Sequence, residues 1–183
     1  MSSKFSINLR LDPDEMLLQY PNIEYNIDTF AYGGMYGGIK IEIDGEALEK
    51  FNGTQCITED HYVEEYLWFF YLDILESIIK LINKEDCVFG FVDSTNSIKL
   101  QYYNRYVLFT FSYGSDIKSN IVDMPILLNQ YIAEVLRSSS EFIESLLNIN
   151  QKVKESKEVK QLIEKYNEAE KAYQEYIRNQ GKD

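Results

Sequence analysis

The sequence predicts an α+β fold, in which an antiparallel sheet of about five to six strands packs on a central helix and two long helices follow at the C-terminal end. Several short segments alternate apolar and polar residues with a period of two, which is typical of half-buried strands. Residues 60–83 and 125–149 instead repeat apolar residues every three or four positions, which is typical of helices. Strands and helices therefore occur in separate runs, and this order favours α+β over a doubly wound α/β fold.

Residues 60–83 are expected to form the central helix. One apolar stripe recurs at helical spacing and consists of Val63, Leu67, Phe70, Ile74, Ile78 and Leu81. Further aromatic and aliphatic residues widen this stripe until little of the circumference is polar, so the helix should be covered on most sides. The longest uninterrupted apolar run, residues 66–72, is far shorter than the roughly 20 residues that span a bilayer. We therefore expect the core helix of a soluble domain.

Strands are predicted on both sides of this helix. Before it, the alternating segments are residues 4–11, 22–31 and 39–43, and the glycine-rich residues 32–38 are expected to form the hairpin turn between the last two. Asp44-Gly45 is a strong turn signal at the far end of that hairpin. After the helix, the alternating segments are residues 87–92, 98–103 and 107–112, which predict a three-stranded meander.

The last third of the chain is expected to be helical. A proline suited to a first helical turn, Pro125, opens the second long helix, and the mostly polar residues 151–158 form a linker. A narrow heptad stripe then runs through Val159, Leu162, Tyr166, Ala169, Tyr173 and Tyr176. Residues 1–150 are thus predicted as a single α+β domain. Residues 151–183 form a heptad helix that packs back on this domain or pairs with a partner.

The charge of the chain restricts its partners. The 183 residues carry a net charge of −12, and residues 11–79 hold half of the 30 acidic residues but only Lys40 and Lys50 of the 18 basic ones. Nucleic acid is an unsuitable ligand because phosphate binding needs a basic surface. An acidic surface favours basic partners and fast, salt-sensitive association. The alternative is that the acidity only keeps the protein soluble.

Groups with catalytic or metal-binding potential are few. His61 is the only histidine, and Glu64 and Glu65 can share its helical face, but a metal site of this type needs a second histidine or more carboxylates. The glycine-rich residues 32–38 precede a strand, whereas a phosphate-binding loop opens a helix. We therefore expect no enzymatic activity, no metal and no cofactor.

The cysteines and the N-terminal residues indicate a reducing compartment. Cys56 and Cys87 are too few for a disulfide framework, and neither belongs to a Cys-x-x-Cys motif. The first residues lack the apolar core of a signal peptide. The expected location is the cytoplasm.

A series of elements in the middle of the chain carries a family resemblance. It runs from Gly38-Ile39-Lys40-Ile41-Glu42-Ile43-Asp44-Gly45 through Val63-Glu64-Glu65-Tyr66 and the amphipathic helix into the meander that ends at Phe111. This series resembles the immunity proteins of polymorphic-toxin systems, which are small acidic proteins that neutralise secreted bacterial toxins. The C-terminal heptad helix does not belong to it. The resemblance implies a cytosolic α+β inhibitor that binds a basic effector through an acidic face.

The leading hypothesis is a non-enzymatic protein that inhibits another protein by occluding a basic, nucleic-acid-handling surface, as in toxin immunity or in phage-encoded inhibition of host defence of the anti-CRISPR type. Clustered carboxylates can imitate the spacing of phosphates, and aromatic residues can anchor the interface. The residues expected to form the binding face are Asp12, Asp14, Glu15, Tyr32, Tyr36, Glu59, Asp60, Glu64 and Glu65. The expected partner is a basic protein, not nucleic acid or a membrane.

Two alternatives use other parts of the chain. One is a structural or oligomerisation module, in which a homodimer forms through Leu162, Tyr166, Tyr173 and Tyr176. The other is a small-ligand binder or enzyme that uses His61 or the glycine-rich residues 32–38.

Overall fold

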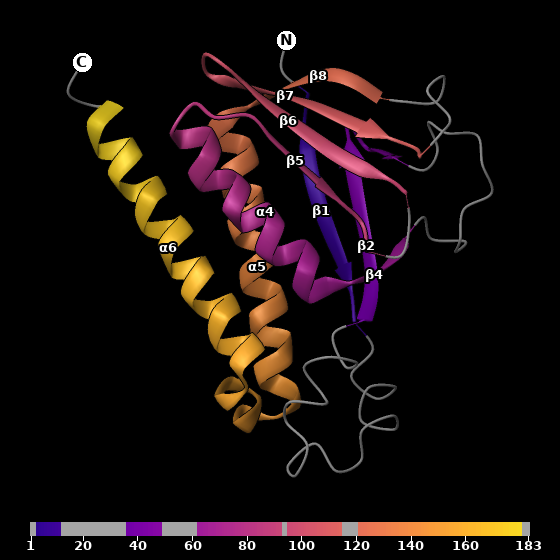
Figure 1. Ribbon diagram of the computed structural model, residues 1–183, viewed down its shortest axis with the longest axis vertical. Coiled ribbons are helices and arrows are strands. Elements are labelled where there is room, and N and C mark those ends of the chain that lie inside the picture. Colours follow the sequence, from indigo (N-terminus) through magenta and orange to yellow (C-terminus); the bar gives the residue numbers. More distant parts are fainter. Residues whose placement is uncertain (1–2, 12–35, 49–61, 93–94, 115–120, 181–183) are drawn as a thin grey trace.

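The computed structural model describes residues 3–11, 36–48, 62–92, 95–114 and 121–180. The elements in chain order are β1 (Phe5–Arg10), β2 (Tyr36–Ile43), β3 (Glu46–Ala47), β4 (Val63–Tyr66), α4 (Leu67–Ile82), β5 (Cys87–Gly90), β6 (Ser97–Tyr103), β7 (Tyr106–Ser112), β8 (Ile121–Leu127), α5 (Leu128–Ile149), the 3-10 helix η2 (Gln151–Glu155) and α6 (Lys157–Gln180). The predicted α+β class is confirmed. In Figure 1 the sheets lie on one side of α4 and α5, and α6 lies on the other side.

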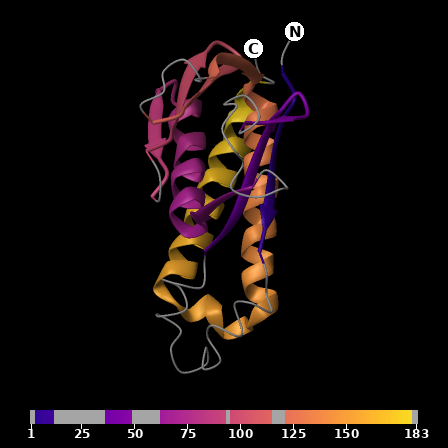
Figure 2. The same ribbon diagram turned by 90° about the vertical axis from the view of Figure 1, so that its right-hand side faces the viewer.

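The described strands form two antiparallel four-stranded sheets, so the prediction of one sheet with five to six strands is wrong. In the first sheet, β2 lies between β1 on one side and both β3 and β4 on the other. The second sheet has the order β5-β6-β7-β8. The helix α4 follows β4 directly and connects the first sheet to β5 of the second. Figure 2 shows the two sheets from the side, with α4 beside the second sheet and α5 beside β1.

Alternation along β1 and β2 is confirmed by burial. Ile7 lies opposite Ile41 in the antiparallel pair, and both side chains face the core. Asp44 and Gly45 both have positive φ and form the two-residue turn between β2 and β3, as the Asp-Gly signal predicted. The predicted strand over residues 22–31 lies outside the described residues.

The second sheet contains the predicted meander and one strand that was not predicted. Residues 121–127 form β8 at the edge of the sheet, and Pro125 lies inside it. The prediction that a helix begins at Pro125 is therefore wrong, and α5 begins at Leu128. An edge strand tolerates proline because one side of the strand needs no ladder hydrogen bonds.

The central helix begins later than predicted. Residues 63–66 form β4, and α4 begins at Leu67. The strand β4 pairs with residues 36–39 of β2, so the end of the glycine-rich segment lies in a strand rather than in the predicted hairpin turn. A Cβ atom on Gly38 would lie 2.9 Å from Cβ of Tyr62. The glycine therefore allows the segment that enters β4 to approach β2 closely.

Two reciprocal tyrosine–serine pairs join α4 to α5. The hydroxyl groups of Tyr71 on α4 and Ser138 on α5 are 2.7 Å apart, and those of Ser77 on α4 and Tyr131 on α5 are also 2.7 Å apart. All four side chains are buried. Because a buried hydroxyl group without a partner is costly, these pairs determine how the two helices align along their axes.

The buried tyrosines predict a loss of stability at alkaline pH. Burial raises the pKa of Tyr71 and of Tyr131 above the usual value. Tyrosines in the unfolded chain ionise near pH 10, so above that pH the folded state binds more protons and the free energy of unfolding should fall as pH rises. In Tyr71→Phe the free energy of unfolding should be lower by about 1 kcal/mol at neutral pH. Above about pH 10 it should fall less steeply with pH than in the wild type.

Urea denaturation of the wild type and of Tyr71→Phe, repeated from neutral to alkaline pH, measures both effects. Tyr103→Phe is the control because Tyr103 is 65% exposed, and it should leave the free energy of unfolding at neutral pH unchanged. An identical alkaline slope in Tyr71→Phe and the wild type would contradict the assignment to this buried hydroxyl group.

The helix α6 packs against both α4 and α5. The indole Nε1 of Trp68 on α4 donates to the carbonyl oxygen of Glu158 at 3.1 Å, and Lys165 lies 2.8 Å from a carboxylate oxygen of Glu76 on α4. The buried residues of α6 are Val159, Leu162 and Ala169, which belong to the predicted heptad stripe. The core-facing side of this helix is thus used within the chain.

Candidate functional site

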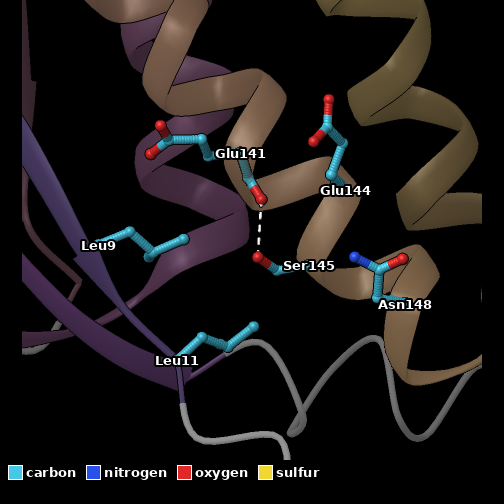
Figure 3. A pocket seen from close by; sticks show the side chains of 6 residues that line it. All are labelled: Leu9, Leu11, Glu141, Glu144, Ser145 and Asn148. Atoms are coloured by element: carbon cyan, nitrogen blue, oxygen red, sulfur yellow. Dashed lines mark hydrogen bonds between the residues drawn. The ribbon is translucent and has the colours of Figure 1, made fainter.

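A groove of about 310 Å³ lies between the end of β1 and the second half of α5 (Figure 3). Its lining residues are Leu9, Leu11, Glu141, Glu144, Ser145 and Asn148. The helical residues are spaced by three, four and seven positions, so they share one side of α5. The groove therefore combines two apolar side chains, one from β1 and one from the residue that follows it, with a polar helical wall.

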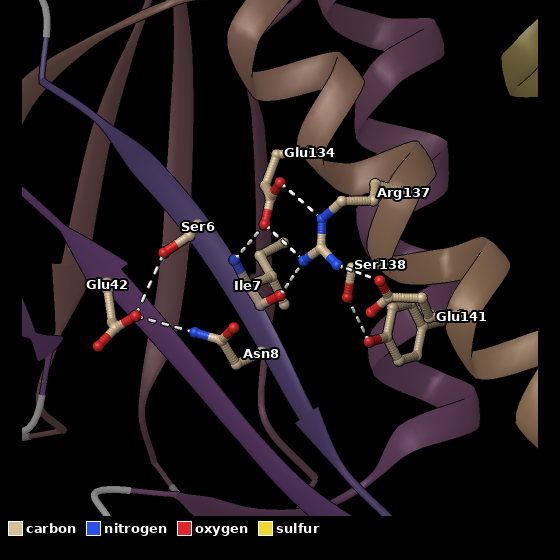
Figure 4. A network of polar contacts seen from close by, with 9 residues as sticks. Ser6, Ile7, Asn8, Glu42, Glu134, Arg137, Ser138 and Glu141 are labelled. Atoms are coloured by element: carbon tan, nitrogen blue, oxygen red, sulfur yellow. Dashed lines mark hydrogen bonds and ion pairs between the residues drawn. The ribbon is translucent and has the colours of Figure 1, made fainter. Parts of the chain in front are cut away.

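Directly before the groove, α5 is tied to β1 at Ile7 (Figure 4). A carboxylate oxygen of Glu134 accepts the Ile7 N–H at 2.7 Å, and the Arg137 guanidinium donates to the Ile7 carbonyl oxygen at 2.6 Å. The two side chains also pair with each other at 2.8 Å. We refer to Glu134 and Arg137 as the Ile7 clamp. The clamp supplies to Ile7 the two partners that a neighbouring strand would otherwise provide.

The groove wall carries more negative than positive charge. Arg137 donates hydrogen bonds to Glu134 and to Glu141, and the bond with Glu134 is the main reason that the pKa of Arg137 is raised. Glu144 is exposed and accepts a hydrogen bond from the Ser140 hydroxyl at 3.2 Å. Within the described part of the chain, Glu144 takes part in no ion pair. Its carboxylate is therefore available to a cation from outside.

Most of the predicted acidic face is not described by the structure. Six of its residues lie outside the described ranges: Asp12, Asp14, Glu15, Tyr32, Glu59 and Asp60. Glu64 belongs to β4, but its side chain is not described. Tyr36 is 41% exposed at the start of β2, where its ring packs edge-on against Tyr66 with 5.2 Å between ring centroids.

Glu65 occupies a buried position, contrary to its expected place on an exposed face. Only 1% of the residue is exposed. One carboxylate oxygen accepts the N–H of Tyr66 at 2.7 Å, and the other accepts the N–H of Val92 at 2.9 Å. The side chain thus joins β4 of the first sheet to the residues that follow β5 of the second. It holds the fold together and cannot contact a partner directly.

The residues expected to support a homodimer contact the chain itself. Leu162 is fully buried between α6 and the rest of the core. Tyr166, Tyr173 and Tyr176 are partly buried against the same core. Burial raises the pKa of each of these three tyrosines.

The described residues include no group of three or more potential metal ligands. His61 and Cys56 lie outside the described ranges. Cys87 is a free, buried cysteine, and its burial raises the pKa of its thiol to about 11. A thiol of this kind has little thiolate character at neutral pH and behaves as a small apolar side chain. No helix in the described ranges has the length and apolar character that crossing a membrane requires.

The polar residues of the groove were not among those that sequence reasoning selected. Glu141, Glu144 and Asn148 lie on the polar side of a helix that the sequence did predict, and their spacing was visible. Nothing in the sequence placed β1 beside that helix, because Ile7 and its clamp are about 130 residues apart along the chain. A scan of protein families, a search of curated proteins and a search of solved structures found no match to this chain.

Proposed function

We propose that this protein is a non-enzymatic inhibitor that binds a basic, nucleic-acid-handling partner protein and covers its basic surface. The observation that carries the proposal is the groove, which is lined by Glu141 and Glu144 together with the apolar residues Leu9 and Leu11. Carboxylates next to apolar surface suit lysine and arginine, whose stems are apolar and whose heads are cationic. The net charge of −12 adds long-range attraction for the same class of partner.

The partner in this proposal is a protein with a Lys- and Arg-rich cleft, such as a nuclease or another nucleic-acid-binding effector. Toxin immunity and phage-encoded inhibition of host defence are two settings that share this physics. Both settings place the protein in the cytoplasm together with its target. Inhibition follows because the same cleft cannot hold nucleic acid and the acidic protein at once.

Charge reversal in the groove is expected to weaken binding without unfolding the protein. The double variant Glu141→Lys/Glu144→Lys replaces attraction with repulsion, and we expect affinity for the partner to fall by at least about tenfold. The free energy of unfolding should change by less than about 1 kcal/mol, because both carboxylates are exposed and the Arg137–Glu141 pair lies at the surface.

The experiment begins with partner capture from the native cytosol. Tagged protein is washed at low and then high salt, and the salt-released protein is identified by mass spectrometry, purified and assayed for nucleic-acid binding. We expect stoichiometric inhibition that the double variant loses. The matched control is Glu164→Lys/Glu175→Lys on α6, which makes the same charge change at exposed residues outside the groove. A captured partner whose nucleic-acid binding persists in the presence of the protein would refute the proposed function.

A further inference from the structure

We infer that the groove receives an extended, lysine- or arginine-containing segment of the partner, which adds to β1 as a further strand of the first sheet. The inference rests on the proposed function and specifies how the partner is held. Three features of the described residues carry it: the direction of the backbone groups of β1, the place where the Ile7 clamp ends, and the charge of the facing helix.

The register between β1 and β2 determines which backbone groups of β1 point away from the sheet. The N–H of Asp44 donates to the carbonyl oxygen of Lys4 at 2.8 Å, so Lys4 bonds toward β2. In an antiparallel ladder the bonding residues alternate, so residues 6, 8 and 10 also bond toward β2. The N–H and C=O groups of Ile7 and Leu9 therefore point to the outer edge of β1. The contacts of Ile7 with α5 confirm this direction (Figure 4).

Among the described residues, Leu9 lies at an open strand edge. β1 is the outermost described strand of its sheet, and the clamp satisfies both backbone groups of Ile7. Two residues further along, the outward N–H and C=O groups of Leu9 form no hydrogen bond within the described ranges. An open strand edge is a template for another extended chain. The clamp blocks such a chain at Ile7, so an added strand would begin beside Leu9.

The groove lies where an added strand would run. Neighbouring strands are about 4.8 Å apart, and the groove is lined by Leu9 and Leu11 on one side and by residues of α5 on the other. A strand advances about 3.3 Å per residue and a helix about 1.5 Å. Two residues of an added strand therefore pass about one turn of α5. Alternate side chains of the segment would face successive helical turns, first near Glu141 and then near Ser145 and Asn148.

The chemistry of these helical residues defines the segment. In the inferred complex, a lysine or arginine head donates to the carboxylate of Glu141 or Glu144, and its aliphatic stem contacts Leu9 or Leu11; all four residues line the groove. The Ser145 hydroxyl donates to the Glu141 carbonyl oxygen at 2.7 Å and keeps acceptor capacity. The Asn148 amide can both donate and accept, which suits a backbone with alternating donors and acceptors.

A short synthetic peptide tests the inference on the full-length protein. The probe is a fluorescein-labelled decapeptide of alternating valine and lysine, and the charge control alternates valine and glutamate. We expect saturable binding of the lysine peptide only, weakened at least about tenfold by Glu141→Gln/Glu144→Gln. The matched control Glu164→Gln/Glu175→Gln should bind as the wild type does. Hydrogen exchange at the Leu9 amide should slow at least about tenfold in the complex.

Backbone methylation separates strand addition from attraction by charge alone. Two further probes carry N-methyl groups either on the valines or on the lysines, so both keep the charge of the parent peptide. Only one of these sets of N–H groups faces β1 in an added strand. We expect that probe to lose at least about tenfold in affinity and the other to bind like the parent.

The possible failures are distinguishable. Strand addition would be overturned if both methylated probes bound equally well, or if hydrogen exchange at the Leu9 amide did not change in the complex. The proposed function would still be supported in that case if a partner were released by salt and inhibited by the protein. Absence of saturable binding by the lysine peptide would also overturn the inference. A dimer of this protein that the peptide dissociates would assign the groove to a second copy and would overturn it as well. The proposed function fails in a different measurement, if the captured partner still binds nucleic acid in the presence of the protein.

Discussion

Replacing Glu65 with alanine is expected to lower the free energy of unfolding by about 3 kcal/mol, the largest effect that we predict for a single charged residue here. The carboxylate is 1% exposed and accepts the N–H groups of Tyr66 and Val92. Hydrogen bonds to a charged acceptor contribute about 1.5–3 kcal/mol each, and alanine leaves both donors without this acceptor. The two sheets would then be held less firmly where β4 approaches the end of β5.

Glu65→Gln should lower the free energy of unfolding less, by about 1–2 kcal/mol, because the amide oxygen can still accept one of the two N–H groups. Glu85→Ala is the matched control: Glu85 is an exposed glutamate between α4 and β5, and its loss should change stability by less than about 0.5 kcal/mol. Urea denaturation followed by circular dichroism measures all three variants. Equal stability of Glu65→Ala and Glu85→Ala would show that the buried carboxylate is not a link between the sheets.

The position of Glu65 illustrates what sequence reasoning could not reach. Charged residues are almost never fully buried unless they are paired, so an exposed place was the reasonable expectation. The residue that explains the burial, Val92, is 27 positions away and offers only its backbone N–H. Almost every residue has a backbone N–H, so the sequence does not indicate which one will donate to a buried carboxylate. A binding defect in a Glu65 variant would therefore report on unfolding and not on a lost contact with the partner.

Strand prediction succeeded where one face of a strand is buried and failed where another signal competed. In β6 and β7 the buried residues alternate with more exposed ones, and the period of two was decisive. The segment that became β4 has apolar residues at positions that fit a helix as well as a strand, so it was assigned to the long helix that follows. In β8, Pro125 matched the preference for a first helical turn, and the sequence did not show that this strand lies at an edge.

The candidate groove was beyond sequence reasoning for a topological reason. The helical period predicted α5 and, with it, a polar side that carries Glu141 and Glu144. The partner of that side is β1, which lies at the other end of the chain, and only the folded structure places the two together. Acidity drew attention to residues 11–79, most of which lie outside the described ranges.

The second large effect concerns the Ile7 clamp. Glu134→Ala is expected to lower the free energy of unfolding by about 2 kcal/mol, because Ile7 loses the acceptor of its N–H and Arg137 loses a charged partner. The Glu134 side chain is only 15% exposed, so water replaces this acceptor incompletely. Glu134→Gln should recover about half of the loss because the amide oxygen can still accept the Ile7 N–H. Glu155→Ala, at an exposed glutamate of η2, is the matched control.

Urea denaturation measures the global loss, and hydrogen exchange at the Ile7 amide measures the local one. In Glu134→Ala we expect hydrogen exchange at the Ile7 amide to accelerate by more than the loss in global free energy of unfolding accounts for. Exchange rates of amides in α6 should rise only as far as that global loss predicts. The difference matters for the groove, because the clamp sets the point at which the edge of β1 opens. Without it, Ile7 joins Leu9 as an open position, and the alternating valine–lysine peptide should slow exchange at both amides. Exchange at Ile7 that is unchanged in Glu134→Ala would mean that α5 does not protect this edge, and the place where an added strand begins would then need another explanation.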